Sequence, residues 1–300
     1  MDRKSYHETT FLDHRIVRPD DQKRHLLFDK KRLDRNRPKP AVDFVFHISF
    51  CGSTLLSRCL DVPGQRLALR EPLVLRQIWE VGKLYPEEFN SARQRKLLRL
   101  VLPLLSKPSA RGESVCIKPT NLMVDLAEEA LAETRGKALC MVLPLESYLL
   151  SVAKKGLETI RRIVELGAFW GKAMGLPNPR TTFQSAAVFW AHHMNRMREV
   201  MQRAPGRTAS LDFERFLATP EEYLDQAVSF LEQSRGSYDL APLKINAKAP
   251  DQPFDALRRH QSQQMMMQTH GAAIRDAAAW LRANVAGDVL HWQLENHLGD

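Results

Sequence analysis

The 300-residue sequence contains no apolar run long enough to cross a membrane, and no apolar signal region near its start, where charged residues begin at Asp2. Its four cysteines include no C-x-x-C pair, which argues against a zinc site and against a disulfide framework. All four lie in or beside apolar segments, as small core residues do: Cys51, Cys59, Cys116 and Cys140. We therefore expect a protein without a bound metal in a reducing cytoplasm.

The sequence also lacks basic segments interleaved with aromatic residues, the pattern typical of RNA-binding surfaces. Its net charge of +9 is uneven, because residues 1–40 hold 12 Lys and Arg against 7 Asp and Glu. Such a basic leader can contact nucleic acid or anionic lipid, or it can simply be solvated. We expect a solvated leader and no nucleic-acid partner. A basic balance also suits an enzyme whose cofactor is a polyanion.

One stretch near the start of the chain has the pattern of a phosphate-binding turn. The apolar run from Val42 to Ile48 predicts a buried strand, a short polar turn follows, and a helical pattern begins at Thr54. The first turn of a helix offers unpaired N–H groups, Gly52 allows a close approach of the backbone, and Ser53 and Thr54 add hydroxyl donors. The alternative is an ordinary strand-to-helix turn with glycine at its corner.

This turn does not match the nucleoside-triphosphate loop G-x-x-x-x-G-K-[ST]. Aligning that pattern on Gly52 and Thr54 places His47 where the first glycine belongs and Ser53 where the lysine belongs. A Mg-ATP site would therefore lack its main cation.

The rest of the chain alternates strand and helix patterns, which predicts a three-layer α/β/α fold with a mostly parallel sheet of about five strands. Further strands are expected at 66–69, 113–117, 137–142 and 208–213. Helices are expected at 73–83, 91–105, 122–134 with Asn121 as its cap, 147–155, 184–203 and 223–232. The arginines at 93, 95 and 99 predict a solvated helix face. We divide the chain into the leader 1–40, a domain over 41–235 with an insertion or lid at 156–180, and a C-terminal extension over 236–300. In that extension, residues 236–260 read as loop and 270–297 as helix, with Trp280 and Trp292 as packing anchors.

Several segments resemble, in order, the motifs of the P-loop sulfotransferase family, in a divergent bacterial-type form. The similarity extends over about residues 42–232. The segments that carry it are Phe50-Cys51-Gly52-Ser53-Thr54-Leu55-Leu56, Glu71-Pro72, Ile117-Lys118-Pro119-Thr120, Leu149-Leu150-Ser151-Val152 with Lys154-Lys155-Gly156, Trp190, and Leu211 to Leu217 with Thr219-Pro220-Glu221.

The resemblance implies a P-loop fold and an enzyme that transfers a sulfuryl group from 3′-phosphoadenosine-5′-phosphosulfate (PAPS) to a hydroxyl or amine acceptor. It implies that the cofactor is held by Phe50, Cys51, Gly52, Ser53, Thr54, Leu55, Arg58, Ser151, Lys154 and Lys155. The acceptor itself is not named by any motif, although the insertion at 156–180 is expected to shape its pocket.

Two departures from the family pattern remove cations. Phe50 stands where the loop usually has Lys or Arg, and Leu143 with Pro144 stands where an arginine usually precedes the serine. Replacement cations would have to come from the residues Arg58, Lys118, Lys154 and Lys155. The departures leave two other functions open: a noncatalytic descendant that binds a nucleotide or a partner, and an atypical P-loop kinase. Ser53 in place of lysine, and the lack of an obvious aspartate at a strand end, count against the kinase.

Three residues have competing interpretations. Glu71 is the candidate base, because it follows a strand, and its alternative is an ion pair with Arg70 or Arg66. Lys118 is the candidate cation for the leaving oxygen, and its alternative is a surface lysine at a turn. Ser151 is a candidate ligand of the 3′-phosphate or a plain helical serine. Elsewhere, His47 inside an apolar strand is expected to be a hydrogen-bonded core residue.

Overall fold

A computed structural model describes residues 38–108, 112–231, 238–246, 249–253, 256–285, 287, 294, 297 and 298. Residues 1–37 of the predicted leader lie outside this range. The chain divides into two compact units. The first comprises Met1–Phe46, Thr54–Leu139 and Leu224–Pro242, and the second comprises His47–Ser53, Cys140–Tyr223 and Leu243–Asp300. The predicted division into leader, domain and extension stays a prediction.

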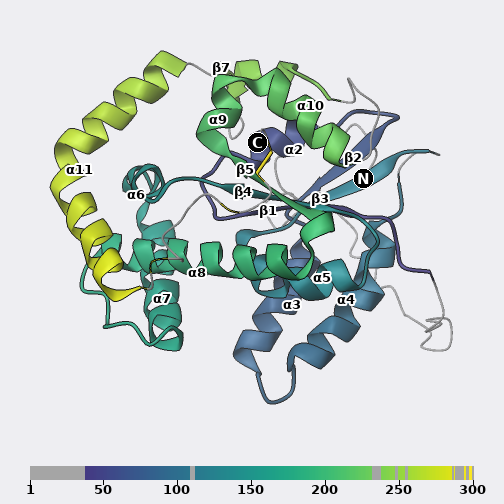
Figure 1. Cartoon of the computed structure of the whole chain (residues 1–300), viewed down its shortest axis with the longest axis horizontal. Helices are drawn as coiled ribbons and strands as arrows, with labels where there is room; N and C mark the ends of the chain where they lie inside the picture. The colour runs from purple at the N-terminus through teal and green to yellow at the C-terminus, as the bar shows by residue number, and fades with distance from the viewer. Residues whose placement is uncertain are drawn as a thin grey trace, which may run out of the picture. The chain divides into compact units, whose positions relative to one another are not determined.

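The chain forms the predicted five-stranded parallel sheet flanked by helices, so the expected three-layer α/β/α architecture is confirmed (Figure 1). The strand order is β2-β3-β1-β4-β5. The bounds are β1 (Asp43–His47), β2 (Arg66–Arg70), β3 (Ser114–Lys118), β4 (Ala138–Val142) and β5 (Thr208–Asp212).

Each strand is five residues long and almost continuously buried, as expected of strands covered on both faces. The order reverses around β1, because β2 and β3 lie on one side of it and β4 and β5 on the other. Ligands of open parallel sheets bind beyond the carboxyl ends of the strands at such a reversal. The loop that follows β1 therefore occupies the position that sheet topology favours for a ligand.

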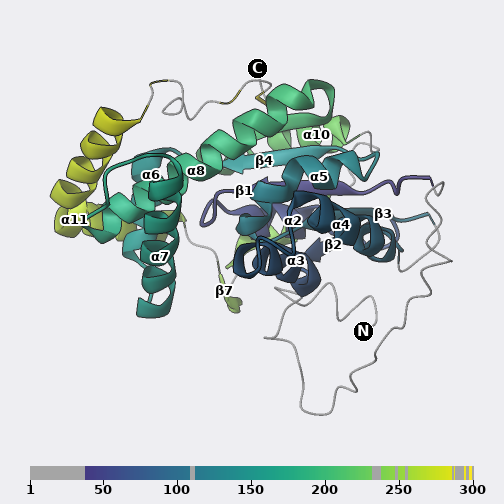
Figure 2. The ribbon, with the colours of Figure 1, turned by 90° about the horizontal axis from the view of Figure 1, so that it is seen from below.

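The helices of the first unit include an antiparallel pair, α3 (Leu73–Leu84) and α4 (Ser91–Leu105), which lie side by side (Figure 2). Asn90 caps α4 by accepting the N–H of Arg93 at 3.2 Å. The arginines of α4 differ from the prediction, because Arg95 and Arg99 form ion pairs with the buried carboxylate of Glu133. That face of α4 is therefore partly an ion-pair surface.

The predicted helix over residues 122–134 is wrong in its form. The chain makes a 3₁₀ helix, η3 (Asn121–Leu126), and then a short α-helix, α5 (Ala127–Ala132). Asn121 is the first residue of η3, whose cap residue Thr120 makes no capping bond with its side chain. Three successive apolar residues, Leu122 to Val124, are all buried, and a single face of an α-helix cannot bury three neighbours at once.

In the second unit, α8 packs against α7, and α11 packs against α6 and α8 (Figure 2). Helix α8 also contacts β5. The bounds are α6 (Leu145–Ala153), α7 (Leu157–Ala173), α8 (Thr182–Arg203), α9 (Phe213–Ala218), α10 (Pro220–Phe230) and α11 (Ala256–Asn284), and α10 continues into the first unit. The predicted insertion is therefore α7 and the loop that follows it. Among the described helices, none combines the length and the apolar character that a bilayer crossing requires.

Residues 236–260, read from the sequence as loop, contain regular structure. A 3₁₀ turn, η5 (Ala241–Lys244), precedes an antiparallel pair of strands, β6 (Ile245–Asn246) and β7 (Ala249–Pro253). Prolines at 250 and 253 had argued for loop, but proline is tolerated on an edge strand, and both strands of a two-stranded sheet are edges. The last helix begins at Ala256, earlier than predicted. Trp280 is half-buried, and Trp292 lies outside the described residues.

Candidate functional site

The loop after β1 has an unusual backbone. Ser49 and Phe50 have φ values of 72° and 54°, and Gly52 has 71°, so three of four successive residues adopt the left-handed conformation. For a residue other than glycine this costs on the order of 1–3 kcal/mol, and such strain concentrates at functional sites. Left-handed residues in succession turn backbone N–H groups toward one side of a loop, as in anion-binding nests. His47 is buried and its Nδ1 accepts the N–H of Ser49 at 3.2 Å, so this histidine is the hydrogen-bonded core residue expected.

Gly52 is required at its position for a second reason. A Cβ atom added there would lie 2.0 Å from a carbon of the Phe213 ring, so the ring rests directly against the glycine backbone. Phe213 follows β5 as the first residue of α9. The sequence predicted that Gly52 gives an anion close access, whereas the structure places an aromatic ring at its Cα.

Phe50, which replaces the basic residue of the family pattern, carries a cation above its ring. The ammonium of Lys155 lies 4.5 Å from the ring centre. The ring also stacks on Tyr148 of α6, with centroids 5.9 Å apart. Burial raises the pKa of the Tyr148 phenol. Two predicted site residues, Phe50 and Lys155, are thereby brought together, and a positive charge stands at the loop although the loop itself has none.

Two further cations, Arg259 and Lys154, lie in the same unit. Arg259 of α11 has its guanidinium 5.3 Å from the centre of the Phe213 ring and forms an ion pair of 2.7 Å with Glu214. Partial burial and the positive charge of Arg259 together lower the pKa of Lys154. Sequence reasoning missed Arg259, because no motif distinguishes it from the other arginines of a segment read as loop.

The other predicted loop residues turn mostly inward. The Cys51 thiol is buried and donates to the Met141 carbonyl at 3.4 Å, so Cys51 offers its backbone and not its side chain. Ser53 and Thr54 are buried at the start of α2 (Ser53–Cys59). Leu55 belongs to the core, and Arg58 is half-buried in the last turn of α2.

Ser151 behaves as a helical serine, because its hydroxyl donates to the Ser147 carbonyl one turn earlier at 3.0 Å. The hydroxyl oxygen keeps its capacity to accept a bond. Its role as a phosphate ligand stays a prediction.

The two predicted catalytic residues pair with each other in the first unit. The Lys118 ammonium contacts a Glu71 carboxylate oxygen, and the Glu71 N–H donates to the Lys118 carbonyl at 2.6 Å. Lys118 is 1% exposed, so the interpretation as a surface lysine is wrong. Glu71 has a left-handed backbone with φ of 55°, a second strained point at a strand end.

The alternative partner proposed for Glu71 has a different role. Arg70 forms a 3.0 Å ion pair with Asp61, and both side chains are almost fully buried. Asp61 also accepts the N–H of Ala68 at 3.1 Å. This pair fixes the chain at β2, so that Glu71 follows directly on a rigid strand end.

The register of the first unit explains why Glu71 and Lys118 meet. Leu69 and Phe44 are both level with Ile117, and Arg70 is level with Lys118. The carboxyl ends of β1, β2 and β3 therefore lie at one edge of the sheet.

An aspartate does stand at a strand end, contrary to the sequence reading. Asp212 ends β5 and caps α9 by accepting the N–H of Arg215 at 2.8 Å. Burial raises the pKa of the Asp212 carboxyl, and hydrogen bonds from the backbone N–H groups of Arg215 and Glu214 partly offset that rise. Among the described residues, no group of three or more His, Cys, Asp or Glu side chains has the arrangement of a metal site.

No protein-family model matches the chain, and no curated protein matches it in sequence. Three solved structures are similar in fold. A sulfotransferase domain from the curacin biosynthetic pathway is 18% identical with a TM-score of 0.45, covering 69% of this chain and 78% of that one. A sulfotransferase from Alicyclobacillus acidocaldarius is 16% identical with a TM-score of 0.44, covering 86% and 97%. The sulfotransferase domain of the Synechococcus PCC 7002 olefin synthase is 15% identical with a TM-score of 0.43, covering 85% and 91%.

Proposed function

We propose that this chain is a sulfotransferase that transfers a sulfuryl group from PAPS to a hydroxyl or amine acceptor. The observation that carries the proposal is the strained loop after β1, with its left-handed residues Ser49, Phe50 and Gly52 and the Lys155 ammonium held above Phe50. A loop of this kind offers N–H groups and a positive charge together, and both favour a bound polyanion.

The residues of the second unit fit the charge of such a cofactor. Lys155 lies over Phe50 of the loop, and Arg259 lies over Phe213. Lys154 lies close enough to Arg259 for the charge of Arg259 to lower its pKa. In our proposal they replace the cations missing at Phe50 and Leu143. Charge-assisted bonds to phosphate contribute roughly 1.5–3 kcal/mol each, so these cations matter for affinity.

The loop N–H groups and the hydroxyls of Ser53 and Thr54 would hold the phosphosulfate. Ser151 and Arg58 remain candidate ligands of the same cofactor. PAPS, when bound, supplies the activated sulfuryl group.

In this proposal Glu71 takes the proton from the acceptor, and Lys118 neutralises the negative charge that develops on the leaving oxygen. Their ion pair holds the two side chains together at one edge of the sheet. No metal is required, because side chains and backbone N–H groups supply the positive field.

Calorimetric titration tests the cofactor class. We expect 3′-phosphoadenosine 5′-phosphate to bind without metal, and Mg-ATP to bind far more weakly or not at all. Preferential binding of Mg-ATP would support a kinase and overturn the proposal. Transfer of ³⁵S-labelled sulfate from PAPS to a panel of phenols, aliphatic alcohols and amines then tests catalysis.

A noncatalytic descendant that binds a nucleotide is the second candidate. It is favoured by the replacement of two family cations, one by Phe50 and the other by Leu143 with Pro144. Binding of the bisphosphate nucleotide without transfer to any acceptor in the panel would support it.

A further inference from the structure

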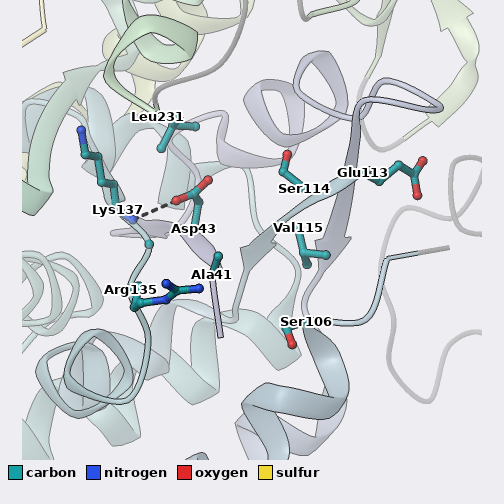
Figure 3. A pocket seen from close by; sticks show the side chains of 10 residues that line it. Ala41, Asp43, Ser106, Glu113, Ser114, Val115, Arg135, Lys137 and Leu231 are labelled. Atoms are coloured by element: carbon teal, nitrogen blue, oxygen red, sulfur yellow. Dashed lines mark hydrogen bonds between the residues drawn. The ribbon is translucent and has the colours of Figure 1, made fainter. Parts of the chain in front are cut away.

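The first unit contains an open cavity at the edge of the sheet where β1 and β3 begin (Figure 3). Its volume is about 440 Å³. Its walls come from the amino ends of β1 and β3 and from the segment Arg135–Lys137 that enters β4. Volumes of roughly 300–1,000 Å³ are typical of small-molecule sites.

Backbone contacts fix two walls of this cavity against each other. The N–H of Lys137 donates to Asp43 Oδ1 at 2.8 Å, and its carbonyl accepts the N–H of Phe44 at 2.8 Å. A Cβ atom on Gly136 would lie 1.9 Å from the Val42 carbonyl oxygen, so only glycine permits this approach. The cavity is therefore preformed and not a gap between mobile segments.

Arg135 presents its guanidinium to the cavity (Figure 3). Its backbone N–H donates to the Pro40 carbonyl at 2.9 Å and its Nε to the Lys39 carbonyl at 3.0 Å. These two bonds orient the group, while its terminal nitrogens point into the cavity (Figure 3). A guanidinium held in this way is suited to a two-point contact with a carboxylate.

Negative charge at the cavity comes from Asp43. Its carboxylate stands on the same wall as Arg135, whereas the carboxylate of Glu113 points away from both (Figure 3). Glu113 instead accepts the N–H of Gly64 at 2.9 Å. The Lys137 side chain, which also belongs to the cavity wall, points away from Arg135 (Figure 3), and its ammonium lies 5.0 Å from the centre of the Phe230 ring. The Arg135 guanidinium and the Asp43 carboxylate are therefore the two charged groups that we assign to a ligand.

The two serines of the cavity offer hydrogen-bond acceptors. Ser106 donates its hydroxyl proton to the Pro103 carbonyl at 2.9 Å, and Ser114 donates its proton to the Gln65 carbonyl at 3.3 Å. Both hydroxyl oxygens are left as acceptors. Val115 and Leu231 add apolar surface.

We propose that this cavity binds a small zwitterion, an α-amino acid whose carboxylate lies on Arg135 and whose ammonium lies on Asp43. A phosphate dianion fits less well, because the Asp43 carboxylate would repel it. A simple cation fits less well, because the Arg135 guanidinium would repel it. A neutral molecule with separated charges places an opposite charge against each group and uses the serine oxygens as further acceptors.

The zwitterion is not a reactant of the proposed transfer. Val115 lies near the start of β3 and Lys118 at its end, and consecutive strand residues rise by about 3.3 Å each. Val115 and Lys118 are thus about 10 Å apart along the strand, with the buried interior of the sheet between them. The proposed amino-acid site does not depend on the proposed sulfuryl transfer, and each can be tested without the other.

Thermal shift and calorimetry on the full chain test the proposal, with the 20 amino acids as probes. N-acetyl amino acids and amino acid amides, each lacking one charge, are the matched controls. We expect at least one amino acid to bind saturably, and both of its single-charge analogues to bind at least tenfold more weakly. Absence of saturable binding by every amino acid, or equal binding of the analogues, would overturn the proposal.

The variant R135Q should lower the affinity at least tenfold, while R161Q, at an arginine whose side chain is 77% exposed on α7, should leave it unchanged. The variant D43N keeps an oxygen that can accept the Lys137 N–H but loses the charge. It should abolish the preference for the amino acid over its N-acetyl analogue. Wild-type affinity in R135Q, with the fold verified by circular dichroism, would contradict the assignment even if D43N failed to fold.

Discussion

The ammonium of Lys155 lies 4.5 Å from the centre of the Phe50 ring. Phe50 stands at the position where the family pattern has a basic residue, so the charge absent from the loop is supplied by the segment after α6. A cation over an aromatic face gains about 0.5–1 kcal/mol when exposed and about 2 or more when desolvated. The ring therefore acts as a support that holds the cation beside the loop.

This relationship predicts a loss of affinity when the cation is removed. The variant K155A should bind 3′-phosphoadenosine 5′-phosphate about tenfold more weakly, because one charge-assisted contact is lost. The variant K172A, at an exposed lysine of α7, is the control and should bind as the wild type does. Calorimetry measures both, and unchanged affinity in K155A would show that Lys155 only packs on the ring.

Gly52 predicts a large loss of stability on substitution. In G52A the left-handed backbone costs about 1–2 kcal/mol, and overlap with the Phe213 ring adds about 1–3 kcal/mol. Gly64 is the matched control, because it has φ of 78° but nothing within 4 Å of an added Cβ. Urea unfolding should show a clearly smaller loss in G64A, and equal losses in the two variants would refute a steric role for Phe213.

The Glu71–Lys118 pair predicts separate effects on rate and stability. The variant E71Q should slow sulfuryl transfer by about 10²–10⁴-fold, because it removes the proposed base. It should leave the affinity for the bisphosphate nucleotide nearly unchanged, because in our proposal Glu71 does not contact the cofactor. The variant E71A should also destabilise the fold by about 3–5 kcal/mol, because the buried Lys118 ammonium loses this carboxylate. E80Q, at a half-exposed ion pair of α3, is the control. Full transfer rates in E71Q would remove Glu71 from the mechanism.

The ion pairs of Glu133 predict a pH dependence of stability. Hydrogen bonds from Arg99, and then Arg95, hold the pKa of Glu133 at about 2, below its ordinary value of 4.5. A carboxyl with a lowered pKa in the folded state contributes stability that is present above its ordinary pKa and lost as the pH falls toward the folded value.

The difference in unfolding free energy between wild type and E133Q should therefore be about 1–2 kcal/mol at pH 7, since both arginines are half-exposed, and should shrink between pH 4.5 and pH 2. Urea titrations at several pH values measure it. A difference independent of pH would contradict the assignment.

Most strands could be predicted from the sequence because they are short segments rich in apolar residues that end at a polar or proline residue, as at Glu71-Pro72. The 3₁₀ helix after β3 could not be predicted, because the burial of three successive residues, Leu122 to Val124, depends on packing partners on several sides of the helix. The loop after β1 was found through its motif, but its contact with Phe213 joins residues 161 positions apart, beyond the reach of local pattern. Arg259 was missed for the same reason.

The position of Arg259 has a consequence for how the protein matures on the ribosome. The loop is complete once Ser53 has been translated, whereas the guanidinium beside Phe213 follows only with Arg259 in α11. A nascent or prematurely terminated chain that stops before Ala256 carries the loop without this charge. The second unit therefore gains this positive charge only after α11 has been translated.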